Sequence, residues 1–153
     1  MKFCLVASRG GHVDELLCFA HKLDGTSFLI TEESAVVPAN WDQVYYVEHI
    51  NRKQKDVIWK IMKLFWLAVK ILREEKPDCF VSTGALISVP ILIMGKIFGK
   101  KVVFVETLAR VNTPSISGRI VYHFADVFIV YWKSLLRFYP KAHHIDLFCE
   151  DKE

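Results

Sequence analysis

Short apolar runs alternate with longer amphipathic stretches along the chain, and this alternation constrains the fold more than any other feature. Most of the runs are apolar at nearly every position, which is typical of strands in a sheet that is covered on both faces. Strands are predicted at residues 2–7, 27–31, 44–47, 78–82, 101–105 and 126–131, and helices at 13–23, 53–75, 86–98 and 115–124. This alternation predicts an α/β fold with a Rossmann-like, doubly wound parallel sheet.

Length and composition fit a single domain over residues 1–153 that carries a single function. Hydrophobic residues make up 52% of the chain and charged residues 24%, which indicates a globular protein with some apolar surface left for a partner or lipid. The net charge is only +3, and no run of Lys and Arg is interleaved with aromatic residues. Nucleic acid is therefore not an expected partner.

The chain start and the cysteines indicate the compartment. The first apolar run is too short for a signal peptide and leads straight into Ser8-Arg9-Gly10-Gly11. The longest stretch without charge, residues 83–95, contains Pro90 and is too short to span a bilayer. We therefore expect a cytoplasmic protein whose attachment to the inner face of the plasma membrane is peripheral. The four cysteines are widely spaced and include no C-x-x-C pair, so we expect reduced thiols and no metal site.

Small and polar residues follow several of the predicted strands. In a doubly wound sheet the binding crevice lies at the carboxyl ends of the strands, where glycines allow close approach and helix N-termini attract phosphate. The candidates are Gly10, Gly11 and His12 after the first strand, Thr83, Gly84 and Ser88 after the fourth, and Glu106 and Arg110 after the fifth. The dinucleotide fingerprint G-x-G-x-x-G is absent, so we expect no nicotinamide or other cofactor.

The residue types alone leave the role of each candidate open. The pair Gly10-Gly11 fits a purely structural turn as well as a ligand loop. His12 is either a packing residue or a group for acid–base chemistry, because imidazole titrates near neutral pH. Glu106 either accepts hydrogen bonds from sugar hydroxyls or simply ends its strand. Arg110 is either a diphosphate ligand or a solvated surface charge.

The order of these motifs resembles the N-terminal half of GT-B glycosyltransferases related to MurG. Gly-Gly-His after the first strand, Thr83-Gly84 with Ser88 and Pro90 after the fourth, and Glu106 after the fifth carry the resemblance. Residues 105–110, Val-Glu-Thr-Leu-Ala-Arg, are similar to the membrane-anchoring subunit of the split N-acetylglucosaminyltransferase of asparagine-linked glycosylation. They also resemble PssD- and CpsF-type proteins of bacterial exopolysaccharide and capsule synthesis. The resemblance extends over about residues 2–148.

This resemblance implies a subunit that is inactive without its partner. In that family a second Rossmann-like domain binds the UDP-sugar donor, and in split systems a separate protein supplies it. The chain is then expected to present a lipid-diphosphate-linked sugar acceptor, to recruit the donor-binding subunit, and to use His12 in catalysis. The residues expected around the acceptor and its phosphates are Gly10, Gly11, Thr83, Gly84, Ser88, Glu106 and Arg110.

The predicted helix 53–75 is a candidate for membrane attachment. On a helical wheel its two tryptophans lie at the border of a sector shared by four lysines, Lys53, Lys60, Lys63 and Lys70. Such a helix suits the headgroup layer of a membrane, although an ordinary helix that packs its apolar face on the sheet has the same pattern. The residues expected to dock are Trp59, Lys60, Lys63, Trp66 and Lys70.

Three functions stay open at this point. The first is the glycosyltransferase subunit, and the second is a structural adaptor that only localises a partner enzyme. The third is a small stand-alone Rossmann-like enzyme acting on a phosphorylated metabolite, which the lack of a complete phosphate loop disfavours. The apolar residues Leu147 and Phe148 follow the last predicted strand and are expected either to dock the donor-binding subunit or to pack on their own domain.

Overall fold

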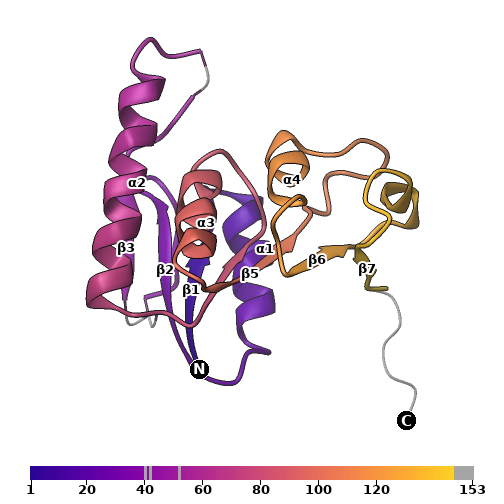
Figure 1. Ribbon diagram of the computed structural model, residues 1–153, viewed down its shortest axis with the longest axis horizontal. Helices are drawn as coiled ribbons and strands as arrows, with labels where there is room; N and C mark the ends of the chain where they lie inside the picture. The colour runs from indigo at the N-terminus through magenta and orange to yellow at the C-terminus, as the bar shows by residue number, and fades with distance from the viewer. Residues whose placement is uncertain (40, 42, 52, 147–153) are drawn as a thin grey trace.

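A seven-stranded parallel sheet with helices on both faces forms the body of the protein (Figure 1). The computed structural model describes residues 1–39, 41, 43–51 and 53–146. The strands are β1 (Lys2–Val6), β2 (Thr26–Glu32), β3 (Val44–Val47), β4 (Cys79–Ser82), β5 (Lys101–Val105), β6 (Val127–Val130) and β7 (His143–His144). Their order is β3-β2-β1-β4-β5-β6-β7, and each neighbouring pair is parallel. The predicted α/β fold is confirmed.

The helices divide between the two faces as the strand order requires. The helices are α1 (Gly11–Ala20), α2 (Val57–Glu74), α3 (Ser88–Ile97) and α4 (Ile116–Val121), followed by a 3₁₀ helix at Lys133–Arg137. The crossover from β1 to β2 runs toward one edge of the sheet, and the later crossovers run toward the other edge. Because parallel crossovers are right-handed, α1 lies on one face and α2, α3 and α4 lie on the other.

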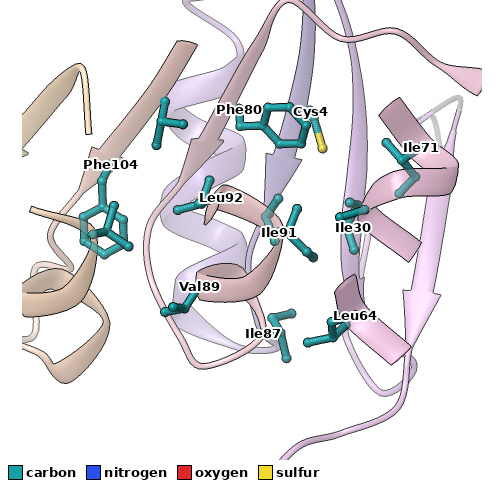
Figure 2. Packing of buried hydrophobic residues seen from close by; sticks show 14 of the residues in the cluster. Cys4, Ile30, Leu64, Ile71, Phe80, Ile87, Val89, Ile91, Leu92 and Phe104 are labelled. Carbon is teal, nitrogen blue, oxygen red and sulfur yellow. The ribbon is translucent and has the colours of Figure 1, made fainter. Parts of the chain in front are cut away.

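Two apolar layers hold these helices on the sheet. On one face, Leu64 and Ile71 of α2 and Ile91 of α3 form one buried cluster with Ile30 of β2 and Phe80 of β4 (Figure 2). On the other face, α1 packs through Leu16 and its apolar neighbours. Each large apolar side chain that is fully buried contributes about 1.5–3 kcal/mol. The central strands are therefore a rigid base for the loops at their ends.

A polar clasp joins the end of α2 to the amino ends of β1 and β3. Glu75 accepts hydrogen bonds from Lys2 Nζ at 2.6 Å, Tyr45 OH at 2.5 Å and Gln43 Nε2 at 2.7 Å. These donors, Lys2 foremost, lower the pKa of Glu75 to about 2. The same carboxylate raises the pKa of Tyr45 to about 12. The clasp lies at the end of the sheet opposite the predicted crevice.

Several element boundaries differ from the sequence prediction. Helix α2 begins at Val57 rather than at residue 53, because residues 53–56 are polar and have no face to bury. Helix α1 begins two residues early, at Gly11. Strand β7 was not predicted, because its two imidazole side chains show no apolar pattern that indicates a strand.

Candidate functional site

The strand order reverses beside β1, and the loops at this point form the predicted crevice. The chain passes from β1 outward to β2 and β3 and then returns to the other side of β1 as β4. In open α/β sheets, ligands bind at the carboxyl ends of the strands at such a switch point. His12 lies in the first turn of α1 and Thr83 directly follows β4. The fold therefore brings together two residues that lie far apart in the sequence.

His12 and Thr83 are joined by two hydrogen bonds. The Nδ1 atom of His12 lies 3.1 Å from the carbonyl oxygen of Thr83, and the Thr83 hydroxyl donates to the carbonyl oxygen of His12 at 2.6 Å. A carbonyl oxygen can only accept, so Nδ1 carries the hydrogen. In the neutral ring Nε2 is then a lone-pair acceptor, and no residue that the structure describes is hydrogen-bonded to it. This tautomer suits a general base.

The other predicted residues of the β4 loop shape the loop itself. Gly84 has φ of +114°, a backbone conformation that strains any residue with a side chain, and it packs beside the imidazole of His12. Ser88 is buried, and its hydroxyl donates to Ala85 O at 2.8 Å. Thr83 is also buried. Binding of the acceptor by these residues stays a prediction.

Glu106 lies in an internal hydrogen-bond network and has only 1% of its surface exposed. Its Oε2 atom accepts from Ser115 N and Ser115 Oγ, both at 3.1 Å, and from Tyr139 OH at 2.9 Å. Burial, followed by the charge of Glu106, raises the pKa of Tyr139. A Cβ at position 118 would collide with Glu106 and Tyr139, so this site requires Gly118. The predicted contact of Glu106 with a sugar is untested, and in this geometry the carboxylate stabilises the fold.

Glu15 is a carboxylate of the crevice that the sequence analysis did not select. Its Oε1 accepts from Thr107 Oγ1 at 2.9 Å and from Leu108 N at 3.2 Å, which ties α1 to the loop after β5. Its Oε2 is shielded and has no hydrogen-bond partner among the described residues. Burial raises the pKa of this carboxyl group. The spacing of three residues from His12 was the available signal, because it places both on one face of α1.

The loops after β5 and β6 carry exposed cations. The side chain of Arg110 is exposed and forms no ion pair with a described residue. The indole of Trp132 donates to Leu108 O at 2.9 Å, which fixes the two loops relative to each other. A cavity of about 360 Å³ opens beside them, lined by Leu108, Tyr131, Trp132, Lys133, Ser134, His144 and Asp146. This cavity lies at the carboxyl ends of β5 and β6, and its lining includes both Lys133 and Asp146.

A second buried carboxylate lies on the opposite side of the switch point and was also not predicted. Glu32 ends β2 and is 2% exposed. His49 Nδ1 lies 3.0 Å from Glu32 Oε1, and Arg9 N donates to Oε2 at 3.4 Å. The Arg9 side chain also donates to Ser34 Oγ at 3.1 Å. This cluster fixes the Arg9-Gly10 turn, after which Gly11 opens α1.

Helix α2 presents its tryptophans to solvent, whereas two of the predicted docking lysines form ion pairs within the protein. Trp59 and Trp66 are 67% and 72% exposed, and docking of these residues at a membrane stays a prediction. Lys60 Nζ is 3.6 Å from Glu48 Oε2, and its side chain is only 14% exposed. Lys63 Nζ lies 3.0 Å from Glu48 Oε1. The lysine strip is therefore partly neutralised within the protein, whereas Lys70 is exposed.

Three other expectations concern features away from the crevice. Across the described residues, no group of three or more His, Cys, Asp or Glu side chains is arranged to hold a metal ion. No helix in the described part of the chain is long and apolar enough to cross a membrane. The predicted partner-docking residues Leu147 and Phe148 lie outside the described residues.

Comparison with known proteins identifies the family. The family model described as "Oligosaccharide biosynthesis protein Alg14 like" matches residues 43–148. The chain belongs to the Alg14 family. The human protein named UDP-N-acetylglucosamine transferase subunit ALG14 is 27% identical over 176 residues, which cover 95% of this chain and 82% of the human one. The protein of the same name from Yarrowia lipolytica is 35% identical over 86 residues, covering 52% of this chain and 40% of its own.

Solved structures share the fold. MurG from Acinetobacter baumannii superimposes with a TM-score of 0.69 at 16% identity, over 84% of this chain and 40% of MurG. The UDP-GlcNAc 2-epimerase from Methanocaldococcus jannaschii, solved with UDP-GlcNAc and UDP, gives a TM-score of 0.69 at 14% identity over 95% of this chain and 46% of the epimerase. The Alg14-family chain thus spans less than half of each solved chain. At these identities the likeness shows the GT-B type of fold alone.

Proposed function

We propose that this Alg14-family chain is the acceptor-side subunit of a heteromeric glycosyltransferase whose donor is a UDP-sugar. The family supports this proposal, because relatives matched over most of their length are named as subunits of a UDP-N-acetylglucosamine transferase. The observation that carries the proposal is the His12–Thr83 pair at the switch point, which leaves Nε2 of the imidazole as a lone-pair acceptor. A partner protein binds the donor.

His12 acts as the general base in this proposal. Nε2 removes the proton of an acceptor hydroxyl while the hydroxyl oxygen forms a bond to the anomeric carbon of the donor sugar. The bond between that carbon and the diphosphate oxygen breaks, and UDP leaves with the electron pair. A positioned base of this kind contributes typically about 10²- to 10⁴-fold in rate. The Thr83 carbonyl keeps the proton on Nδ1 throughout.

The acceptor in this proposal is a sugar linked to a lipid diphosphate, and the product is a repeat unit of a surface polysaccharide such as capsule or exopolysaccharide. Arg110 is exposed beside the crevice, and an Arg guanidinium is suited to bidentate contact with phosphate. The Gly10-Gly11 turn lets an acceptor approach the backbone at the start of α1. These groups hold the diphosphate while the sugar hydroxyl reaches His12.

Membrane docking through α2 places the subunit where such an acceptor lies. The exposed Trp59 and Trp66 and the exposed Lys70 give α2 the composition of an interfacial helix. Sedimentation with anionic vesicles tests the docking: the purified chain is expected to pellet at low salt. Failure to pellet would contradict the proposed membrane docking but would have no bearing on the proposed role of His12 in sugar transfer.

Partner recruitment is tested by co-expression with a candidate donor-binding subunit from the same genome. A stable heterodimer usually buries more than about 1,000 Å² in total, so the pair should elute together in gel filtration. Charge substitutions at Leu147 or Phe148 are expected to weaken the complex if these residues dock the partner. An adaptor without acceptor chemistry would also form the complex, but its partner's activity would not depend on His12.

A further inference from the structure

A shallow apolar groove lies between the outward sides of α2 and α3. Its volume is about 320 Å³, and its lining consists of Met62, Phe65, Trp66, Val69 and Met94. All five residues are apolar, and the first four belong to α2. The buried residues of α2, such as Leu64 and Ala68, pack on the other side of the helix, whereas Met94 of α3 both lines the groove and packs against the core.

The groove continues into a larger exposed apolar surface. Trp66 is 72% exposed and Met62 is 47% exposed. Ile58 on α2 is 74% exposed, and Ile97 and Phe98 at the end of α3 are 68% and 51% exposed. Single exposed apolar side chains are common, but a contiguous group of this kind marks an interaction site.

The charges beside the groove indicate what occupies it. Lys63, Lys70 and Arg73 are exposed on α2, and the only acidic residue in this helix is Glu74, at its last position. Cations and tryptophans around an apolar face are the arrangement of helices that lie in the headgroup layer. A groove in such a face can accommodate the hydrocarbon chain of a lipid, whereas a flat face only contacts the membrane surface.

We propose that the α2–α3 groove binds the hydrocarbon chain of an anionic membrane lipid, with Lys70 and Arg73 contacting the headgroup phosphate. This inference rests on the proposed docking of α2 at a membrane. It adds that one lipid chain leaves the bilayer core and packs against Met62, Trp66 and Met94, so that attachment depends on a defined lipid site as well as on general charge attraction.

Tryptophan quenching by brominated lipid chains tests the groove directly. The full chain is mixed with vesicles of phosphatidylglycerol and phosphatidylcholine that carry bromine in the acyl chains. Trp59 is replaced by Phe first, because it is exposed on the same helix without lining the groove. In this background Trp66 emission is expected to fall, and the further change Trp66→Phe is expected to remove most of the quenching. Trp41, which packs on the α1 face, should stay unquenched. Binding to vesicles without quenching of Trp66 would contradict the proposal that the groove binds a lipid chain, but it would not contradict membrane docking.

Two variants separate the groove from general charge attraction. Val69→Trp fills the groove without changing charge, and Met62→Glu places a carboxylate at its exposed edge. Each is expected to weaken partitioning into anionic vesicles about tenfold, since loss of the chain contact or one repelling charge is of that size. Val36→Glu is the control, because Val36 is 87% exposed on the loop between β2 and β3. Circular dichroism melting checks that all three fold.

The alternative occupants give different results. If a second copy of this chain covers the groove, Trp66 becomes shielded as protein concentration rises, and sedimentation velocity shows a dimer that Val69→Trp abolishes. Either finding in the absence of lipid would contradict the proposal. Equal partitioning of Val69→Trp and the unmodified chain would contradict it as well.

Discussion

His12 and Thr83 hold each other through two hydrogen bonds that run in opposite directions across the switch point of the sheet. The imidazole Nδ1–H donates to Thr83 O at 3.1 Å, and the Thr83 hydroxyl donates to His12 O at 2.6 Å. The first bond fixes the tautomer of the ring and the second fixes the backbone that carries it. The carbonyl oxygen and the hydroxyl group of Thr83 therefore both position His12.

Replacing His12 separates its positioning from its chemistry. His12→Asn retains an N–H group that can donate to Thr83 O but has no basic nitrogen. We expect both His12→Asn and His12→Ala to lower kcat of the reconstituted pair by about 10²- to 10⁴-fold, because each removes the base. Melting temperatures and gel filtration check that the variants fold and bind the partner. Activity of His12→Asn within tenfold of the unmodified protein would show that His12 only packs.

Gly118 is predicted to be essential for stability. Gly118→Ala drives a Cβ into the Glu106 carboxylate and the Tyr139 hydroxyl, and we expect a loss of about 1–3 kcal/mol in the free energy of unfolding. Gly11→Ala is the matched control, because its Cβ meets no atom within 4 Å. Alanine in a helix is favoured over glycine, so this control should be unchanged or slightly more stable. Urea unfolding of the two variants measures the difference, and equal stabilities would contradict the network.

Glu106 itself is predicted to contribute mainly to stability. In Glu106→Gln the amide oxygen can accept from Ser115 and Tyr139 only if the amide nitrogen faces the N–H of Thr107, which donates to Glu106 Oε1. One donor therefore loses its acceptor, and we expect a loss of about 1–3 kcal/mol in the free energy of unfolding. Acceptor KM is then measured well below the melting temperature of the variant. A KM close to that of the unmodified pair fits the buried geometry. A raised KM with unchanged kcat would instead support the contact with a sugar that the sequence indicates.

The Glu75 clasp predicts a pH dependence of stability in the acid range. The folded-state pKa of Glu75 is about 2, whereas the ordinary value is 4.5. A lowered folded pKa means that the stabilisation is complete above the unfolded pKa and is lost as pH falls from about 4.5 toward 2. Glu75→Gln should therefore flatten that part of the profile. Thermal melts between neutral pH and the acid limit measure the effect, and parallel profiles for both proteins would contradict it.

The sequence predicted the layers of the fold better than the details of the site. Apolar runs such as those of β1 and β5 show a buried parallel sheet because both faces of these strands are covered. The end of the sheet at β7 was missed because its two residues pair through backbone atoms, which leave no pattern in the side chains.

The partners of polar side chains were harder to predict from the sequence. For Glu106 the sequence left two roles open, a contact with sugar hydroxyls or the end of its strand. Its donors Ser115 and Tyr139 are brought together only in the folded chain. Glu15 was passed over because its partners, Thr107 and Leu108, lie on another strand's loop. The ion pair between Lys60 of α2 and Glu48 could not be predicted from the helix pattern, because Glu48 directly follows β3, a separate element of the fold.

Sugar transfer from a UDP-sugar to a lipid-diphosphate-linked acceptor tests the central claim most directly. The rate is measured for this chain alone, for the candidate donor-binding subunit alone, and for the two together. The measurement on the pair is then repeated with the His12→Asn variant of this chain. The account predicts product only from the pair, with the rate reduced about 10²- to 10⁴-fold by the substitution. Efficient transfer by this chain without a partner, or by the pair irrespective of His12, would contradict it.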